Sequence, residues 1–294
     1  MTTLNRLATG LRGLPIGQVR LGRVLYGTTA GLLALLVVGK FFLVLQDAIP
    51  DGRLAFDFRV YADIAQQWLN TGAMYAPFQL AGPYVNEIYV NGGVINSYPP
   101  PVTLLFTVFI FAPAILWWII PLWIMTSMTV YWRPKAWSWP LIAGSLALLP
   151  FAISIAMGNT ILWMMAATAL ATRWPGAALG LAGKPILLPF ALPFLRPRRS
   201  WVVAAIIAGA LALVTWPWWP DYVVAARNGA IGLGLFGSLF YYFPHQFLVL
   251  VPLIPWLATT RPRAAGKRSN ATSSATAAPS ATAAPSTEAA STAG

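Results

Sequence analysis

The sequence predicts an all-α integral membrane protein. Of its 294 residues, 58% are hydrophobic and only 9% are charged, whereas an average soluble domain is roughly 25% charged. Long apolar runs alternate with short clusters of Lys and Arg, and the first run exceeds the length of about 20 residues that a helix needs to cross a bilayer. This composition excludes a water-soluble globular domain.

The charge balance also has a membrane explanation. The chain carries 19 Lys and Arg against 7 Asp and Glu, which gives a net charge of +12. Binding to nucleic acid would account for such an excess, but the bases here lie between apolar runs, where membrane topology explains them better. The chain has no cysteine and a single histidine, His245, so disulfides, thiolate chemistry and His-rich metal clusters are excluded.

The first predicted membrane segment is an uncleaved signal anchor. Four arginines lie within the basic N-terminus, residues 1–23, and the apolar run 24–45 follows them. A cleavable signal peptide would have a shorter apolar core and a small-residue exit, but this run leads into Gln46, Asp47 and Pro50. We therefore expect residues 1–23 on the cytoplasmic side and a multi-span membrane domain over residues 24–259.

The later apolar stretches include two irregular ones. Stretch 102–131 contains Pro113 and Pro121, so we expect two helical pieces that together make one crossing. Stretch 175–194 has basic residues on both sides and an interruption at Lys184. We expect it to form a re-entrant hairpin of two half-length helices, since irregular backbone is tolerated in a membrane where protein or a cavity surrounds it. The other stretches cover residues 139–157, 160–172, 201–219 and 244–259.

Charge segregation predicts the orientation of these segments. Five of the seven acidic residues lie in residues 47–97, which we predict to be one long extracytoplasmic loop. A second outer segment is expected at 220–243. The basic clusters that include Arg133, Arg173 and Arg198 then lie in the cytoplasm. Residues 260–294 are rich in Ala, Ser, Thr and Pro after a basic start, which predicts a disordered cytoplasmic tail.

Asp57 is the strongest candidate for chemistry in the outer loop. It lies between Phe56 and Phe58, about ten residues beyond the first span, so partial desolvation would make the carboxylate more basic. Arg59 could hold its charge and orientation. The alternative is structural, because Asp is a favoured N-cap residue and a helical run follows.

The order of the motifs resembles a known family. A basic N-terminus and one span precede an outer loop that opens with the DFxxY element of Asp57 and Tyr61. A Gly-to-Tyr element ending at Tyr75 and the YPP element that begins at Tyr98 follow, and a second block runs from a Gly-Asn helix to a Lys-Pro break at Lys184. This order, over about residues 20–220, resembles polyprenyl-phosphate-sugar-dependent glycosyltransferases of the GT-C superfamily, and within it glycosyltransferase family 87, the bacterial α-1,2-mannosyltransferases.

The resemblance implies a GT-C-like polytopic helical bundle and an inverting hexosyltransferase with Asp57 as the catalytic base. Arg59 and His245 could counter the phosphate charge, although His245 could equally be an interfacial residue satisfied by water. Lys184 faces a cavity or a phosphate, or else snorkels to the cytoplasmic face. A solvated loop face is the alternative for Glu87. The expected substrate-binding residues are Arg59, Tyr61, Tyr75, Glu87, Tyr98, Lys184 and His245.

The function implied is transfer of a sugar, with mannose foremost, from a polyprenyl phosphate to an extracytoplasmic glycolipid or glycan. The protein would lie in the plasma membrane as a multi-pass protein with its active site outside. We expect no metal, because no DxD-type pair accompanies Asp57, no cofactor, and no nucleic acid as a partner. The alternatives are a transporter or flippase for lipid-linked sugar, and a reduced, non-catalytic GT-C homologue that acts as an assembly subunit.

Overall fold

A computed structural model describes residues 16–50, 52–84, 89–90, 93–195, 199–233 and 243–259. These residues form helices joined by short turns, and one small antiparallel ribbon pairs β1 (Tyr89–Val90) with β2 (Gly93–Val94). The predicted all-α class is therefore confirmed. The tail at 260–294, Glu87, Arg198 and most of the basic N-terminus lie outside the described residues.

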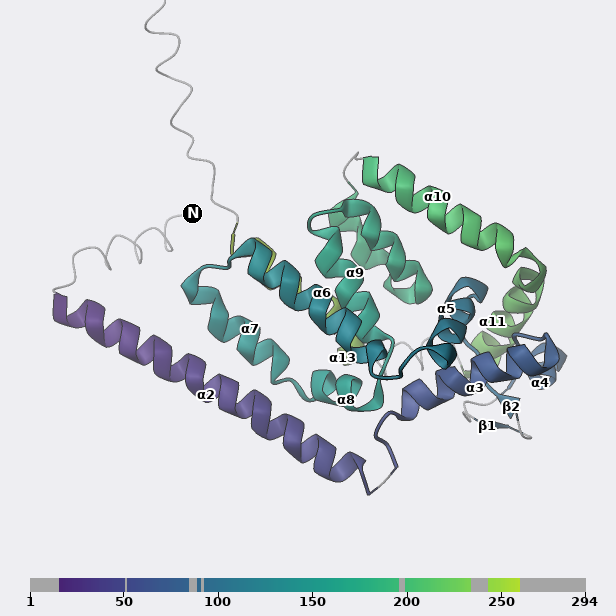
Figure 1. The fold of residues 1–294 in the computed structure, drawn as a ribbon, viewed down its shortest axis with the longest axis horizontal. Coiled ribbons are helices and arrows are strands. Elements are labelled where there is room, and N and C mark those ends of the chain that lie inside the picture. Colours follow the sequence, from purple (N-terminus) through teal and green to yellow (C-terminus); the bar gives the residue numbers. More distant parts are fainter. Residues whose placement is uncertain are drawn as a thin grey trace, which may run out of the picture. The chain divides into compact units, whose positions relative to one another are not determined.

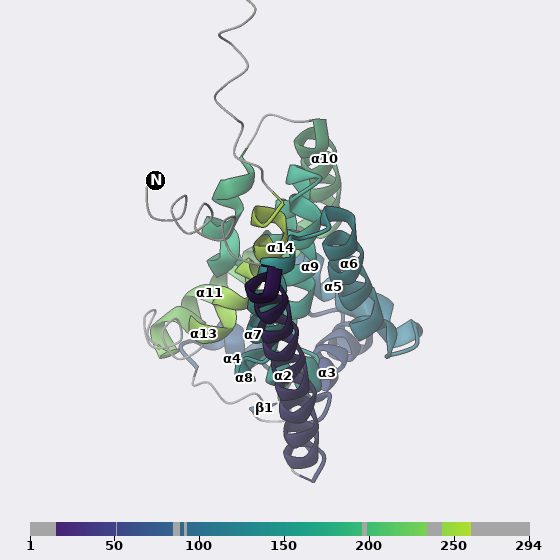
Figure 2. The ribbon, with the colours of Figure 1, turned by 90° about the vertical axis from the view of Figure 1, so that its left-hand side faces the viewer.

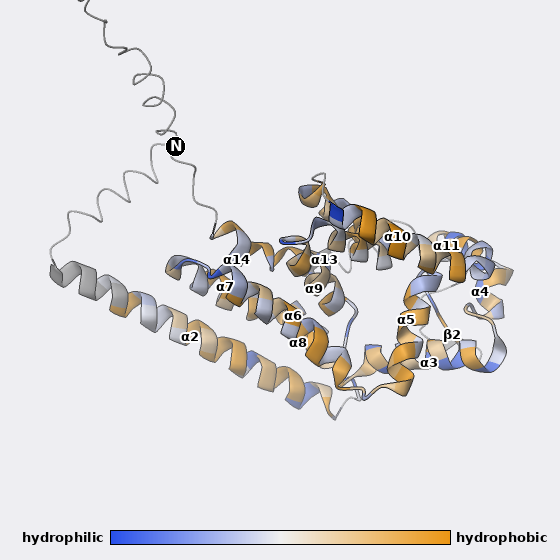
Figure 3. Cartoon of the chain, turned by 45° about the horizontal axis from the view of Figure 1, so that its top comes forward, coloured by the Kyte–Doolittle hydropathy of each residue, from blue (hydrophilic) through white to orange (hydrophobic). Residues whose placement is uncertain are grey.

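Helix α2 (Ile16–Ala48) contains the predicted first span. Within the described residues, Val24–Ala48 is the one helical segment long and apolar enough to cross a membrane unaided, and none of its most apolar window is buried. The helix lies alongside α7 (Trp139–Leu146) and α8 (Leu149–Met157) (Figures 1 and 2). Figure 3 shows its largely hydrophobic middle. Side chains such as Leu35, which is 69% exposed, face outward.

Three further apolar segments are bent helix pairs. The axes of α5 (Pro100–Phe111) and α6 (Leu116–Trp132) meet at 112°, and those of α7 and α8 at 61°. Helices α10 (Arg199–Val214) and α11 (Trp219–Leu233) meet at 69°. If each bent pair is one span, the described residues contain up to four spans by length and composition.

The stretch 102–131 contains two prolines, and only Pro113 lies where the helix breaks. The chain leaves the helix between α5 and α6 at Pro113, as predicted, because proline lacks an amide donor and restricts the residue before it. Pro121, by contrast, lies inside α6 without ending it. The stretch thus consists of two helical pieces, as expected, that meet at 112°, and their joint crossing of the membrane stays a prediction.

The predicted hairpin at 175–194 consists of two short helices, but they are 3₁₀ rather than α-helices. They are η2 (Pro175–Gly183) and η3 (Pro185–Phe194), and Lys184 separates them. Pro185, Pro189 and Pro193 recur every four residues in η3, so regularly spaced amide donors are missing from an α-helical pattern. At about 2.0 Å per residue, each helix extends about 20 Å.

The last predicted span, 244–259, also differs from one continuous helix. It consists of α13 (Phe243–Phe247), η5 (Leu248–Leu250) and α14 (Leu253–Leu257). Pro252 lies at the break before α14, and Pro255 lies inside that helix, so proline explains only the second of the two divisions. The remaining short elements are α4 (Pro77–Ala81), η1 (Ala136–Ser138) and η4 (Trp216–Trp218).

Two buried clusters hold the helices together. Helix α9 (Ile161–Ala171) is almost wholly buried and packs against η2, η3 and η5. The second cluster joins α3 (Phe56–Thr71) to α5 and α6 around Trp117, which is 1% exposed. The Trp117 indole donates to the carbonyl of Gly158 at 2.7 Å. This bond ties the second cluster to the turn between α8 and α9.

We predict that Gly158→Ala destabilises the protein while Gly144→Ala does not. Gly158 ends α8 at φ 72°, where strain costs about 1–3 kcal/mol in a residue with a side chain. A β-carbon there would also lie 2.7 Å from the Trp118 ring, whereas one at Gly144, inside α7, would meet nothing within 4 Å. Thermal unfolding in detergent compares the two variants, and equal midpoints would contradict the prediction.

Candidate active site

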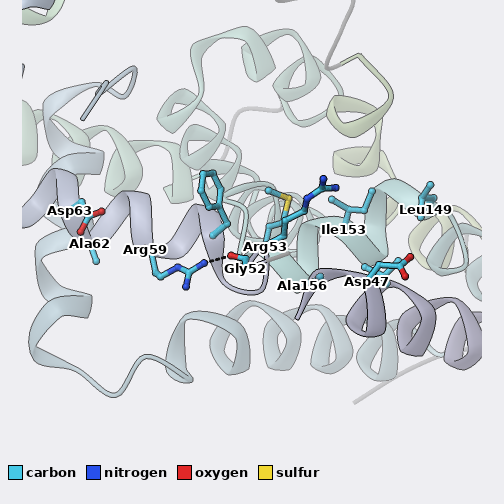
Figure 4. Close-up of a pocket in the computed structure, with 13 residues that line it drawn as sticks. Asp47, Gly52, Arg53, Arg59, Ala62, Asp63, Leu149, Ile153 and Ala156 are labelled. Carbon is cyan, nitrogen blue, oxygen red and sulfur yellow. Dashed lines mark hydrogen bonds between the residues drawn. The ribbon is translucent and has the colours of Figure 1, made fainter. Parts of the chain in front are cut away.

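Helix α3 presents two different faces. Its buried stripe contains Tyr61 and Ile64, and Asp57 precedes them by four and seven residues, which places the carboxylate on the same face. Arg59 and Asp63 lie on the opposite side, where they line a cavity of about 910 Å³ between α3, α8 and the end of α2 (Figure 4). This cavity and Asp57 are therefore on different faces of one helix.

Asp57 does not act as the N-cap of α3. The helix begins at Phe56, and the residue before it, Ala55, has a left-handed backbone (φ 57°) with no side-chain cap. Oδ2 of Asp57 instead accepts a hydrogen bond of 2.6 Å from Nδ2 of Asn159. The capping alternative is therefore wrong, although the first helical turn still favours a negative charge.

Asn159 is held rigidly where it meets Asp57. Its backbone amide donates to Ser154 at 2.9 Å, and its Oδ1 accepts from the backbone amide of Ile161 at 2.9 Å. The side chain thus caps the start of α9 with its oxygen and leaves its amide donor for Asp57. The sequence gives no signal for the bond to Asp57, because the two residues are 102 positions apart.

One cationic side chain from another segment acts on this carboxylate. The charge of Lys184, at the break between η2 and η3, acts on both Asp57 and His245. Burial raises the pKa of the Asp57 carboxyl, and the Asn159 hydrogen bond and the Lys184 charge only partly oppose this rise. Asp57 therefore holds a proton more strongly than an ordinary aspartate.

Two of the predicted tyrosines lie in the same neighbourhood. The Tyr98 hydroxyl donates to the Tyr61 hydroxyl at 3.2 Å and lies 3.1 Å from Oγ1 of Thr160. Tyr61 stacks on Phe106 with ring centroids 4.6 Å apart. Burial, together with the neighbouring Tyr98 and Asp57, raises the pKa of Tyr61. The ring therefore stays a neutral phenol at physiological pH and contributes hydrogen bonds rather than charge.

Two other predicted site residues, Tyr75 and Arg59, make structural contacts instead. Tyr75 is 1% exposed and donates to the Tyr98 carbonyl at 2.8 Å, so it supports that backbone and has no surface for a substrate. Arg59 donates to the carbonyl of Gly52, on the cavity side of α3, so it does not orient Asp57 as expected. Glu87 lies outside the described residues.

His245 lies at the edge of this neighbourhood. Its Nδ1 and Oε1 of the adjacent Gln246 are buried and have no hydrogen-bond partner among the described residues. Buried polar atoms are normally paired. Within the part of the chain that the structure describes, both atoms are therefore available for hydrogen bonds to a bound molecule.

The assembled site contains a carboxylate, an amide, an ammonium and an imidazole from four separate segments. Among the described residues, no group of three or more His, Cys, Asp or Glu could hold a metal ion. Comparison of the chain with protein-family models, with curated proteins and with solved structures found no match. The arrangement offers a carboxylate of raised proton affinity as a proton acceptor, together with a cation that can meet an anionic group.

We predict that Asp57→Asn leaves the protein at least as stable as the native chain at pH 7.5. A carboxyl whose pKa is raised by folding binds its proton more tightly in the folded state, so its ionised form costs stability at neutral pH. Native stability should therefore rise as the pH falls toward about 4, the pKa of an unfolded aspartate. Asn159 can still donate to the new side-chain oxygen.

Thermal unfolding of native and Asp57→Asn protein at pH 7.5, 6 and 5 measures this difference. The difference in unfolding midpoint between the native protein and Asp57→Asn should shrink as the pH falls. Asp221→Asn, which removes a carboxylate from the first turn of α11, is the control for charge at a helix start. A variant less stable than the native chain by more than about 1 kcal/mol at pH 7.5, the size of a lost cap, would contradict the account.

Proposed function

We propose that the protein is a polytopic membrane glycosyltransferase of the GT-C type. It transfers a sugar, with mannose foremost, from a polyprenyl phosphate to an extracytoplasmic glycolipid or glycan, and Asp57 is the general base. The observation that carries the proposal is the half-buried Asp57 carboxylate, which accepts a hydrogen bond of 2.6 Å from Asn159 and lies within the electrostatic reach of Lys184. Asp57 opens the DFxxY element on which the resemblance rests.

The reaction fits this set of groups. Asp57 takes the proton of the acceptor hydroxyl as that oxygen forms a bond to the anomeric carbon of the donor. The bond from that carbon to the phosphate oxygen breaks, and polyprenyl phosphate leaves with the electron pair. The raised proton affinity of Asp57 favours transfer of the hydroxyl proton. The nearby Lys184 ammonium stabilises the negative charge on the leaving phosphate. Attack opposite the leaving group inverts the anomeric centre.

The distribution of charge supports the proposed orientation. The cavity beside α3 is lined by Asp47 and Asp63 and also by Arg53 and Arg59, in the segment predicted to lie outside. A second cavity gathers Arg173 and Arg199 with the end of α6, all of which are predicted to lie inside. The cavity predicted to lie inside has bases without acids, and the cavity predicted to lie outside has both, which agrees with a plasma-membrane protein whose site faces outward.

A second candidate function is transport of a lipid-linked sugar across the membrane. It is favoured by the two broken 3₁₀-helices that meet at Lys184, because discontinuous helices often form the substrate sites of transporters. Movement of a labelled polyprenyl-phosphate sugar between the leaflets of reconstituted vesicles, without an acceptor, would favour this candidate.

We predict that Asp57→Asn lowers sugar transfer by about 100- to 10,000-fold, the usual effect of removing a general base. Purified native protein, Asp57→Asn and the control Asp221→Asn would be compared for transfer of labelled mannose from polyprenyl phosphate. The control should keep native activity. Retention of more than half of native turnover by Asp57→Asn at saturating donor would exclude Asp57 as the base. No turnover by the native chain with any acceptor would favour the non-catalytic alternative.

We also predict the orientation, which single cysteines can report because the chain has none of its own. Ser97→Cys should react with a membrane-impermeant maleimide added outside intact cells. Arg198→Cys should react only after the cells are opened, because the hairpin returns the chain to the cytoplasmic side. Outside labelling of a cysteine at position 198 would overturn the re-entrant hairpin.

A further inference from the structure

A second cavity of about 590 Å³ lies away from Asp57, where the ends of several elements meet. The end of α9 contributes Arg173 to it and the start of α10 contributes Arg199. The ends of α6 and η3 and helix α14 supply most of the remaining wall. None of the described residues that line it is acidic.

The arginines of this cavity lack acidic neighbours along a long part of the chain. No Asp or Glu lies between Glu87 and Asp221 in the sequence. The Arg173 guanidinium instead lies between two aromatic rings, 4.3 Å from the centroid of Tyr131 and 4.7 Å from that of Trp174. Such cation–π contacts involve the flat faces of a guanidinium. They leave its in-plane N–H donors for an anion.

The start of α10 completes the polar part of the cavity. Helix α10 begins at Arg199, and its first amide groups have no partners within the helix. Gly176 fixes this end in place, because its backbone amide donates to Oγ of Ser200 at 3.2 Å. A β-carbon on Gly176 would lie only 2.0 Å from the Ser200 carbonyl oxygen, so no other residue permits this close approach.

An apolar surface adjoins these donors. No described residue of α10 is buried, and its next turns expose Val202, Val203 and Ile206, each by more than half. Pro193 and Trp256 add apolar wall to the cavity itself. An anionic group bound to the arginines would thus lie beside a surface that suits acyl chains, which favours a lipid over a free ion.

We propose that this cavity binds the phosphate of an anionic phospholipid from the inner leaflet. Arg173 and Arg199 contact the phosphate, and the acyl chains lie along α10. Basic pockets between helices on the cytoplasmic side of membrane proteins bind such headgroups. The site requires the membrane orientation proposed above, but it does not require transferase activity, so its binding can be measured whether or not sugar transfer is detected.

The test uses the full chain, purified in neutral detergent, and follows its thermal unfolding during titration with three probes. These are phosphatidylglycerol, phosphatidylcholine with the same acyl chains, and inorganic phosphate. Phosphatidylglycerol should raise the midpoint in a saturable way, because a ligand that binds only the folded state stabilises it. An equal rise with phosphatidylcholine, or with phosphate at the same concentration, would overturn the assignment to an anionic lipid.

Single substitutions then test whether the two arginines of the cavity bind phosphatidylglycerol. Arg173→Gln and Arg199→Gln should each weaken the apparent affinity for phosphatidylglycerol by roughly 10- to 100-fold, the worth of a hydrogen bond to a charged group. Lys135→Gln removes an exposed base that does not line the cavity and should bind as the native chain does. If Arg173→Gln fails to fold, the exposed Arg199 carries the same test. Native affinity in Arg199→Gln would overturn the proposal.

Discussion

The hydrogen bond from Asn159 to Asp57 is the contact on which the candidate site depends. It joins the first turn of α3 to the turn between α8 and α9. A carboxylate removed from water is costly unless it is hydrogen-bonded or paired with a charge. Asn159 supplies the bond, and Lys184 supplies the charge at a distance. The position of the backbone around Asn159 therefore determines whether the half-buried Asp57 carboxylate keeps its hydrogen bond.

Several features of the fold serve this requirement. Gly158 adopts the left-handed backbone that ends α8 one residue before Asn159, and Trp117 binds its carbonyl. The Tyr61 hydroxyl accepts from the backbone amide of Thr160 at 3.3 Å, one residue after Asn159. Hydrogen bonds to side chains of α3 and α6 thus fix the turn on both sides of Asn159, whose side-chain amide donates to Asp57. This arrangement favours a carboxylate that is oriented as well as basic.

The sequence predicts the groups of the site better than their contacts. Motif order singled out Asp57, Tyr61, Tyr98, Lys184 and His245, and the structure brings these residues into one neighbourhood. The partner of Asp57 could not be found this way, because a contact across 102 residues leaves no local pattern. The divergence of Arg59 was predictable, since residues two apart on a helix are separated by about 200°.

For the helices too, the sequence predicts local features better than it predicts how distant segments pack. The length of the first apolar run predicts α2, and Pro113 predicts the break before α6. Pro121 was misleading because one proline inside a helix need not end it when the surrounding structure compensates. The segment after His245 divides at Pro252, a signal that is present in the sequence but is outweighed there by hydropathy. The 112° turn between α5 and α6 depends on packing around Trp117, which local sequence does not encode.

The most direct test of the central contact is the pH dependence of kcat/KM for sugar transfer in native and Asn159→Asp protein. Asp at position 159 keeps an oxygen for the amide of Ile161, so the cap of α9 remains. It replaces the donor that faces Asp57 with a second carboxylate, and two carboxylates at this distance share one proton. The account predicts that the acid limb of the profile moves to higher pH by about one unit or more. A lower rate with an unshifted acid limb would contradict it.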